Sequence, residues 1–435
     1  MKKCVLGDYI LDMASGPFGS NLKVECFVSS GFPIIDGANL YGVRVTDNVT
    51  KFVTEEKARS LSRSIAKRHD VIVTISGTLG QVAYIPSDSL YEEYLCSQRQ
   101  FRVTFDESKI DVEYLVNLLH TDYGQKKILS FANYVGVPAL SQPLPNFRRI
   151  ELELPDIEKQ HEIANIISTI DRKIALNRKR IATLEAMAKE IYDYWFVQFD
   201  FPDAHGRPYK SSGGAMVYNP DLKREIPKGW EVCRIGDHIT ANRGISYSTK
   251  DISSGNGVPM INLNSFNVDS SYKVKGIKMF DGEIPPTKRI SPYDLVMCNT
   301  QQTDLDPCKD IIGKSFLVPD IFEGTIVSSH HVTTIHVDDD NLKVYLNALF
   351  HTREFHAYIV GYASGTSIRG LNFLGVKNCY IAVPHMPLLS KFANLALSCE
   401  MEKSRILRNQ KMLQALHDFL LPLLMNGQVK IGDVE

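Results

Sequence analysis

The chain has 435 residues, of which 44% are hydrophobic and 23% are charged, so it is too long for one ordinary domain and too apolar to be disordered. Its 49 basic and 50 acidic residues leave a formal net charge of −1. An overall basic excess of the kind that nucleic-acid-binding chains carry is therefore excluded, and any DNA-binding surface must be local.

The amino-terminal sequence MKKCVLGDYI has two lysines but no apolar stretch after them, so it is not typical of a secretory signal. No run of about 18 apolar residues follows, and we expect no membrane span. The eight cysteines form no C-x-x-C pair, which argues against a zinc framework or a redox pair. They are interpreted as core thiols of a protein in a reducing cytoplasm.

The first 150 residues predict a mixed domain. The stretch DVIVTISGTLGQVAYI at 70–85 is typical of two strands around a glycine turn, and FRVTFD at 101–106 predicts another strand. The sequence VEYLVNLLHTDYGQKKIL at 112–129 predicts one helix.

After Pro155 the pattern becomes helical. Apolar residues alternate in steps of four and three, the heptad pattern of a coiled coil, and at about 1.5 Å per residue they predict a rod of roughly 48 Å. The stripe is interrupted only by Asn177 and consists of Ile163, Ile167, Ile170, Ile174, Asn177, Ile181, Leu184, Ala188, Ile191 and Trp195.

The second half repeats the first at offsets of 229 to 233 residues, after a linker or surface excursion at 200–230. VLGDYI at 5–10 matches RIGDHI at 234–239, YLVNLLHT at 114–121 matches YLNALFHT at 345–352, and RIELELP at 149–155 matches CYIAVP at 379–384. The strand at 101–106 matches TTIHVD at 333–338. Matched segments in one order indicate a tandem duplication.

A second long helix follows Pro384 with the same spacing: Leu395, Cys399, Glu402, Ile406, Asn409, Leu413, Leu416, Leu420 and Leu423. Asn409 interrupts this stripe where Asn177 interrupts the first. Because a buried Asn in a coiled coil fixes register, the matched positions favour antiparallel helices in which the two side chains meet. The alternative is that each Asn faces solvent on its own helix.

The triplet Gly313-Lys314-Ser315 resembles the end of a nucleotide-binding P-loop. That loop requires a glycine five residues earlier, where this chain has Cys308. In the repeat, Gly80 is followed by Gln81 and Val82 instead of a lysine and a hydroxyl. We therefore expect a duplicated turn and no bound nucleotide.

Other catalytic patterns are also incomplete. An amino-methyltransferase needs Asn/Asp-Pro-Pro-aromatic, but Asn219-Pro220 is followed by an aspartate. Pro202-Asp203 with Asp221-Leu222-Lys223 matches a nuclease metal motif, yet it lies in the linker and has no counterpart in the repeat. His330-His331 with His336 could suggest a metal, but adjacent strand residues point to opposite faces. We expect no catalytic and no metal-binding residues.

The sequences NRKRIATLEAMAKEIYDYWFVQFDF at 177–201, IPKGWEVCRIGD at 226–237 and LHDFLLPLLMNGQVKI at 416–431 resemble the specificity subunit of type I restriction–modification systems. The resemblance covers essentially the whole chain. It implies an α+β fold with two similar target-recognition domains, separated by two long helices that form an antiparallel coiled coil with a pseudo-two-fold repeat. The implied segments are 1–154 and 201–383 for the domains, the latter with its linker, and 155–200 and 384–435 for the helices.

The same resemblance implies that each domain reads one half of a split, asymmetric site in double-stranded DNA. Two methyltransferase subunits are implied to dock near the helices and to methylate adenine with S-adenosylmethionine, and motor-nuclease subunits are implied to join with ATP and magnesium. This chain would carry no cofactor and perform no chemistry. Two alternatives remain: a stand-alone DNA-modifying enzyme, and a coiled-coil scaffold that binds only protein.

Base edges are read by Arg, Lys, Asn and Gln on exposed loops. Such loops supply the DNA-binding candidates, each of which could equally be an ordinary surface residue: Asn21, Lys23, Asn39, Arg44, Gln81, Asn242, Arg243, Lys250, Asn262, Asn264, Gln301, Gln302, Lys314 and Arg369. Lys314 is a candidate phosphate contact. At the end of the first helix an aromatic cluster faces either the methyltransferase or the recognition domains: Tyr192, Tyr194, Trp195 and Phe196.

Overall fold

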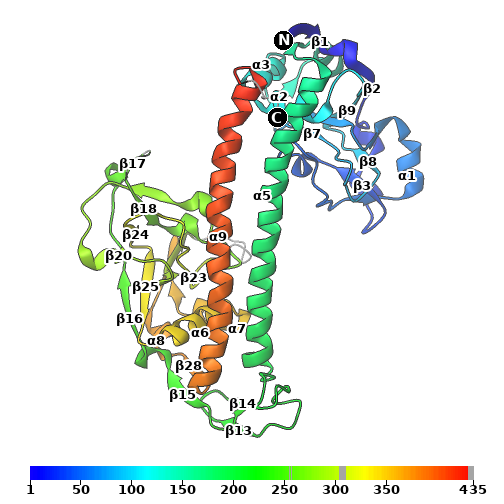
Figure 1. Cartoon of the computed structure of the whole chain (residues 1–435). Coiled ribbons are helices and arrows are strands. Elements are labelled where there is room, and N and C mark those ends of the chain that lie inside the picture. The colour runs from blue at the N-terminus through cyan, green and yellow to red at the C-terminus, as the bar shows by residue number, and fades with distance from the viewer. Residues whose placement is uncertain (254, 256, 303–309, 430–435) are drawn as a thin grey trace. The chain divides into compact units, whose positions relative to one another are not determined.

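The computed structural model describes residues 1–253, 255, 257–302 and 310–429, so Cys308 lies outside the described part. The chain forms two compact units, Met1–Ile174 with Leu413–Glu435, and Ala175–Met412 (Figure 1). Each unit contains one globular domain and a part of each long helix. No described helix is long and apolar enough to cross a membrane.

The domain of the first unit is built on two four-stranded sheets. One has the order β2 (Ile10–Ser15), β9 (Gln100–Phe105), β6 (Val71–Thr74) and β7 (Val82–Tyr84), with antiparallel neighbours throughout. The other has the order β4 (Phe52–Val53), β3 (Phe32–Ile35), β8 (Glu93–Cys96) and β5 (Ile65–Lys67). Its β3–β8 pair is parallel. The short strands β1 (Lys2–Val5) and β12 (Glu151–Leu154) pair separately and join the two ends of the domain.

The helices of this unit follow their capping residues. Asp111 accepts a hydrogen bond from the Tyr114 amide and starts α2 (Val112–His120), and Asp156 accepts one from the Lys159 amide at the start of α5 (Ile157–Tyr192). The shorter helices are α1 (Glu55–Ser60), α3 (Asp122–Leu129) and α4 (Pro143–Arg148). Apolar residues of α2 pack on the first sheet, and the same core includes Ile163 and Ile167 of α5 and Leu424 of α9 (Met386–Met425).

The single helix predicted at 112–129 is wrong, because Thr121 divides it into α2 and α3. Thr121 has extended backbone angles, and its hydroxyl accepts from the Gly124 amide at 3.2 Å. A Cβ on Gly124 would lie 2.3 Å from the Leu118 carbonyl oxygen, so only glycine lets α3 turn back against α2. Thr352 divides the repeated segment in the same way, between α6 (Asp340–Phe350) and α7 (Arg353–Val360).

The domain of the second unit repeats this plan. Its first sheet has the order β16 (Ile239–Arg243), β25 (Val332–Val337), β21 (Leu295–Cys298) and β23 (Ser315–Leu317). Its second has the order β17 (Ile252–Ser253), β19 (Lys278–Phe280), β18 (Val258–Ile261), β24 (Ile326–Ser328) and β20 (Arg289–Ile290), and the β18–β24 pair is again parallel. The pair β15 (Glu231–Arg234) and β28 (Tyr380–Val383) corresponds to β1 and β12.

Three smaller elements complete the second unit. The strands β22 (Thr300–Gln302), β27 (Ile368–Leu371) and β26 (Ala363–Ser364) form a small sheet, and α8 (Leu374–Asn378) follows it. The excursion at 200–230 contains a hairpin of β13 (Met216–Asn219) and β14 (Arg224–Pro227). Its Phe201, Ile226 and Trp230 belong to the core of this unit, so the excursion is part of the folded domain.

Single hydrogen bonds are also repeated between the two domains. The His120 ring donates from Nε2 to the Val82 carbonyl at 2.7 Å, and His351 donates from Nε2 to the Ser315 carbonyl at 2.9 Å. Gly80 and Gly313 lie at equivalent turns just before β7 and β23, and both have positive φ angles, 85° and 71°. The predicted duplication is confirmed down to these side chains.

The equivalent histidines His120 and His351 should make the folding stability of both units sensitive to acid. Burial lowers the His351 pKa to about 4 from the usual 6.5, and it lowers the His120 pKa as well. The unfolded chain therefore binds more protons below pH 6.5, and the stability of the second unit should fall between pH 6.5 and 4 by about 3 kcal/mol. Urea unfolding at a series of pH values measures this loss. In His351→Gln the loss should shrink, and an unchanged pH profile in that variant would contradict the assignment.

The apolar stripe predicted for the first helix is buried or half-buried along its whole length, from Ile163 to Trp195. The stripe predicted for α9 is wrong at its start and near its end, because Leu395 is 42% exposed and Leu416 is 44% exposed. The first turns of α9 instead bury Leu388, Leu389 and Phe392 in the core of the second globular domain. That part of α9 therefore follows the helical spacing of a face packed on a domain, not a coiled-coil seam.

Within the second unit the long helices run antiparallel. Asn177 donates from Nδ2 to Asn409 Oδ1 at 3.1 Å, as the matched positions predicted. Arg180 pairs with Glu402 at 2.9 Å and Lys403 pairs with Glu185 at 3.0 Å. Compared with the Asn177–Asn409 contact, these pairs lie later in the sequence on α5 and earlier on α9, as in antiparallel helices. In the first unit Asp171 lies 3.6 Å from His417, which gives the same direction. The supercoil itself stays a prediction.

Removing one member of the asparagine pair should cost stability. Asn177 is only 8% exposed, so Asn409→Ala leaves a buried carboxamide without this partner. The expected cost is about 1–2 kcal/mol in the unfolding free energy. A double-mutant cycle with Asn177→Ala measures the coupling between the two side chains. Additive effects of the two substitutions would show that the hydrogen bond contributes nothing.

The aromatic cluster at the end of α5 packs inside the second unit. Tyr192, Trp195 and Phe196 are buried, and the Phe196 ring lies 4.8 Å from Phe392 and 5.0 Å from Tyr345. A π-helical turn at Asp193–Val197 brings these side chains to one face. Of the two alternatives, packing against the recognition domain is confirmed for these three residues, whereas Tyr194 is 39% exposed.

Candidate nucleic-acid interface

The first unit has an open hollow of about 940 Å³ where four loops converge. The loop after β2 contributes Gly16–Gly19 and Asn21, and the segment before β5 contributes Arg63. The segment after β6 contributes Ile75 and Ser76, and the turn between β8 and β9 contributes Gln98 and Arg99. In the part of the chain that the structure describes, no aspartate or glutamate lines the hollow, although acidic residues are as frequent in the chain as basic ones. Two arginines with amide and hydroxyl groups around them offer donors to phosphates and base edges.

Gly16 lines this hollow and allows the loop after β2 to approach the backbone of the β8–β9 turn closely. Its amide donates to the Gln100 carbonyl at 2.7 Å. A Cβ on Gly16 would lie 1.8 Å from the Ser97 carbonyl oxygen. The loop after β2 can therefore rest on the β8–β9 turn only because this residue has no side chain. Beyond it, Phe18 is 83% exposed at the rim.

The second unit has the same contact in the same place. The Gly244 amide donates to the Val332 carbonyl at 3.0 Å, and a Cβ there would lie 2.1 Å from the Ser328 carbonyl oxygen. The cleft beside it is narrow, none of the described residues that line it is a carboxylate, and its lining includes Arg243, Lys288 and Arg289. Each domain therefore presents basic and polar groups beside a glycine that follows the first strand of its first sheet.

The predicted residues of the first domain separate into two groups. Asn21 lines the hollow and Lys23 is exposed close by in the chain. Asn39 is buried, and its carboxamide donates to the carbonyls of Thr46 and Asn48 at 3.1 and 3.2 Å. Gln81 is half-buried and donates to the Gly37 carbonyl at 3.1 Å. Asn39 and Gln81 thus hold their own loops together, a structural role in place of the expected base contact.

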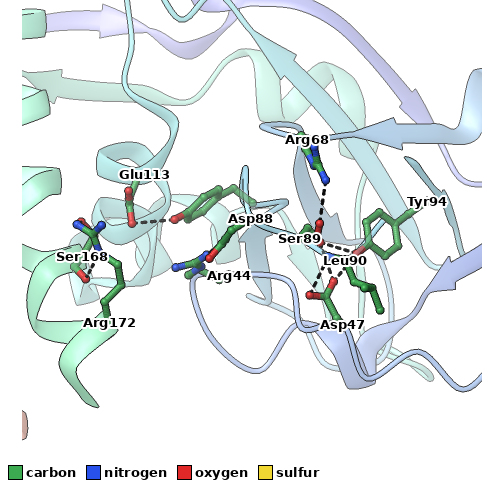
Figure 2. A network of polar contacts seen from close by, with 11 residues as sticks. Arg44, Asp47, Arg68, Asp88, Ser89, Leu90, Tyr94, Glu113, Ser168 and Arg172 are labelled. Carbon is green, nitrogen blue, oxygen red and sulfur yellow. Dashed lines mark hydrogen bonds and ion pairs between the residues drawn. The ribbon is translucent and has the colours of Figure 1, made fainter. Parts of the chain in front are cut away.

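Arg44 lies in a different network of polar contacts (Figure 2). It forms an ion pair with Asp88. Beside this pair, the Tyr84 hydroxyl donates to Glu113 at 2.7 Å. Burial raises the Glu113 pKa, and hydrogen bonding to Tyr84 lowers it in part. Arg44 also lines a cavity of about 470 Å³ together with Asp88 and Glu113, so these carboxylates balance its charge. Arg44 is therefore not part of the basic lining of the hollow that contains Arg99.

In the second domain, Asn242 and Arg243 line the cleft beside Gly244, and Lys250 and Asn264 are exposed. Asn262 is buried, and its Nδ2 donates to the Gly276 carbonyl at 2.7 Å, so it has the structural role that Asn39 has in the first domain. Gln302 ends β22.

Three further candidates of this domain are paired or partly buried within it. Gln301 is buried, and its side chain accepts from the Ile311 amide at 2.5 Å. Arg369 pairs with Asp310 at 3.1 Å. Lys314 is half-buried, and burial lowers its pKa.

The arrangement around Lys314 excludes a P-loop. Ser315 is fully buried in β23, and its hydroxyl contacts Asn347 Oδ1 at 3.3 Å. The triplet thus leads into a strand, whereas a P-loop leads into a helix whose amino terminus holds phosphate. In the linker, Asp203 binds the His205 and Arg207 amides and the Arg207 guanidinium. Among the described residues, no group of three or more His, Cys, Asp or Glu is placed to hold a metal.

Gln98, Arg99, Arg63 and Lys288 were missed by sequence reasoning. They lie in short connections between strands, without the Gly-rich or Asn-rich context that drew attention to the other loops. Only aligning the β8–β9 turn with its counterpart in the repeat could have found the first two.

Comparisons with known proteins identify the fold. Residues 27–186 match the family model described as the type I restriction modification DNA specificity domain. The type I restriction enzyme MjaIX specificity subunit of Methanocaldococcus jannaschii is 24% identical over 389 residues, which cover 88% of this chain and 82% of that protein. The HindI specificity subunit of Haemophilus influenzae is 22% identical over 333 residues, covering 64% of this chain and 69% of that protein.

Among solved structures, the type I restriction-modification system S subunit from M. genitalium has a TM-score of 0.62 at 12% identity and covers 97% of this chain and 95% of its own. At this identity the likeness shows a shared fold, in agreement with two recognition domains and two long helices. The domain model covers residues 27–186, and the relatives extend the match into the second half of the chain. Residues 27–186 thus match a type I restriction modification DNA specificity domain, and the whole chain is similar in sequence and in fold to type I specificity subunits.

Proposed function

We propose that this chain is the sequence-specific DNA-recognition subunit of a type I restriction–modification complex and performs no catalysis of its own. One observation carries the proposal. Each of the two repeated domains presents basic and amide side chains around a glycine contact, and no carboxylate is among the described residues that line it. In a chain with a formal net charge of −1, local basic surfaces without acidic residues favour the binding of a polyanion such as DNA.

The target is a bipartite and asymmetric site in double-stranded DNA. The fold of the two domains is repeated, but the side chains around Gly16 and Gly244 are not: Asn21, Gln98 and Arg99 in one domain, and Arg243, Lys288 and Arg289 in the other. Different side chains read different bases, so the half-sites differ. Two recognition domains that bind the same face of one duplex contact half-sites about one helical turn apart, or multiples of it.

The partners are two methyltransferase subunits and, for cleavage, motor-nuclease subunits. S-adenosylmethionine, and ATP with magnesium, belong to these partners, and adenine is the methylated base. Exposed apolar side chains on the long helices support a protein partner there: Leu176, Met187, Met401 and Met412 in the second unit, and Leu416 and Phe419 in the first. Solvent-facing Met, Leu and Phe at this density mark an interaction surface more often than a free helix face.

A methylation map tests this function. Genomes are compared from a strain that expresses the chain with its candidate methyltransferase and from one that lacks the chain. Methyladenine at one split motif, only when the chain is present, supports the specificity role. Identical maps contradict it.

Two measurements separate the alternatives. Methylation by the purified chain with cofactor alone would favour a stand-alone enzyme. Failure of the chain with its methyltransferase to bind the motif duplex would favour a protein-only scaffold. For the proposed role we expect binding that weakens as salt rises, because phosphate contacts release counterions.

A further inference from the structure

The turn between β8 and β9 in the first domain and the turn between β24 and β25 in the second are the same structural element. The Ile75 amide donates to the Arg99 carbonyl at 2.7 Å, and the Asn299 amide donates to the His331 carbonyl at 3.0 Å. The Gly16 and Gly244 contacts bracket the two turns in the same way. Gln98-Arg99 of one domain therefore corresponds to His330-His331 of the other.

The first of these turns carries a permanent charge. Gln98 and Arg99 are both exposed at the hollow, and Arg99 has no acidic partner within ion-pair distance among the described residues. A free guanidinium and a free carboxamide are side chains that form bidentate contacts to guanine and adenine. The arginine stays charged at any pH at which the protein is folded.

The second turn carries two imidazoles instead. The His330 and His331 ring centroids are 3.8 Å apart, and His331 Nδ1 lies 2.6 Å from the Thr300 hydroxyl on β22. The groups that face the pair from neighbouring elements are the Tyr247 ring, 5.9 Å from His330, and Lys278 of β19, whose Nζ is 3.3 Å from the Tyr247 hydroxyl. No carboxylate contacts either ring among the described residues.

The charge state of this turn follows from its surroundings. Burial, the second imidazole and Lys278 all lower the pKa of His331. Its ring is therefore neutral at pH 7 and gains a proton, a donor and a positive charge below its pKa. Both histidines are half-buried; His331 is held by its contact with Thr300, whereas the buried Nδ1 of His330 has no hydrogen-bond partner among the described residues.

We propose that these two turns are the matched specificity-determining elements of the two recognition domains, and that the His330-His331 turn makes reading of the second half-site depend on pH whereas the Gln98-Arg99 turn does not. This inference rests on the proposed function. It assigns the dihistidine to DNA contact, with a phosphate or base-edge acceptor as its ligand.

The test uses the full chain with its methyltransferase and a duplex that carries the motif found by methylation mapping. Affinity is measured between pH 5.5 and 8 at constant salt, with the second half-site intact and with it scrambled. For the wild type we expect affinity to rise about tenfold toward low pH, and only when the second half-site is intact. The variant with His330→Gln and His331→Arg should lose this rise and change the second half of the methylated motif.

The matched variant with Gln98→Ala and Arg99→Ala should relax the first half of the motif and keep the pH response. Thermal unfolding of each variant checks that the exposed turn of the first domain and the half-buried turn of the second can be changed without unfolding the domain. If the wild type specifies one split motif but both variants keep that motif and the same pH response, this inference is wrong and the proposed function stands. If the wild type specifies no motif, the result contradicts both this inference and the proposed function.

Discussion

Gly16→Ala should abolish reading of the first half-site and Gly244→Ala should abolish reading of the second, each without effect on the other. The added methyl would lie 1.8 Å from the Ser97 carbonyl oxygen in one domain and 2.1 Å from the Ser328 carbonyl oxygen in the other. Backbone cannot rotate away as a side chain can, so the loop must leave the turn it rests on. We expect about 1–3 kcal/mol of destabilisation and about a hundredfold weaker duplex binding through that half-site.

Two other glycines provide matched controls. A Cβ on Gly42 of the first domain or Gly370 of the second meets nothing within 4 Å, and neither residue has a positive φ. Gly42→Ala and Gly370→Ala should therefore bind the duplex as the wild type does. Methylation maps of the four variants report the two halves of the motif separately. Equal loss of both half-sites in Gly16→Ala would show that the domains do not read independently.

Phe392→Ala should be among the most destabilising single substitutions in the second unit. The ring is fully buried among Tyr192, Trp195, Phe196 and Tyr345, and it joins α9 to the end of α5 and to the globular domain. Removing a buried phenyl ring from such a cluster costs about 3–5 kcal/mol, because the rings around it cannot all collapse into the space. Urea unfolding monitored by tryptophan fluorescence measures the effect directly, since Trp195 is in the cluster.

The control is on the same helix, three residues later. Leu395 is 42% exposed, so Leu395→Ala should cost less than about 1 kcal/mol. The pair of variants distinguishes the observed packing from the coiled-coil seam that the heptad spacing predicted. A larger loss from Leu395→Ala than from Phe392→Ala would favour the seam and contradict the packing described for α9.

Several features follow from the sequence because they depend on local periodicity or on comparing the chain with itself. The duplication, the strands at 71–74 and 82–84, the long helices and the matched pair Asn177 and Asn409 all have this origin. A four-and-three spacing puts side chains on one helical face wherever the helix lies. The sequence could not distinguish a face packed on a partner helix from one packed on a domain, which is why Leu395 was misplaced.

The placement of polar loop residues was decided by tertiary structure alone. By composition, Asn39, Asn262 and Arg44 are as good candidates for DNA as Asn21 or Arg243. The fold buries the first two against backbone carbonyls and pairs Arg44 with Asp88. It brings Arg63 and Arg99, 36 residues apart in sequence, to one hollow. The physical reason is that a side chain's neighbours come from strand pairings between distant segments, and local sequence does not encode them.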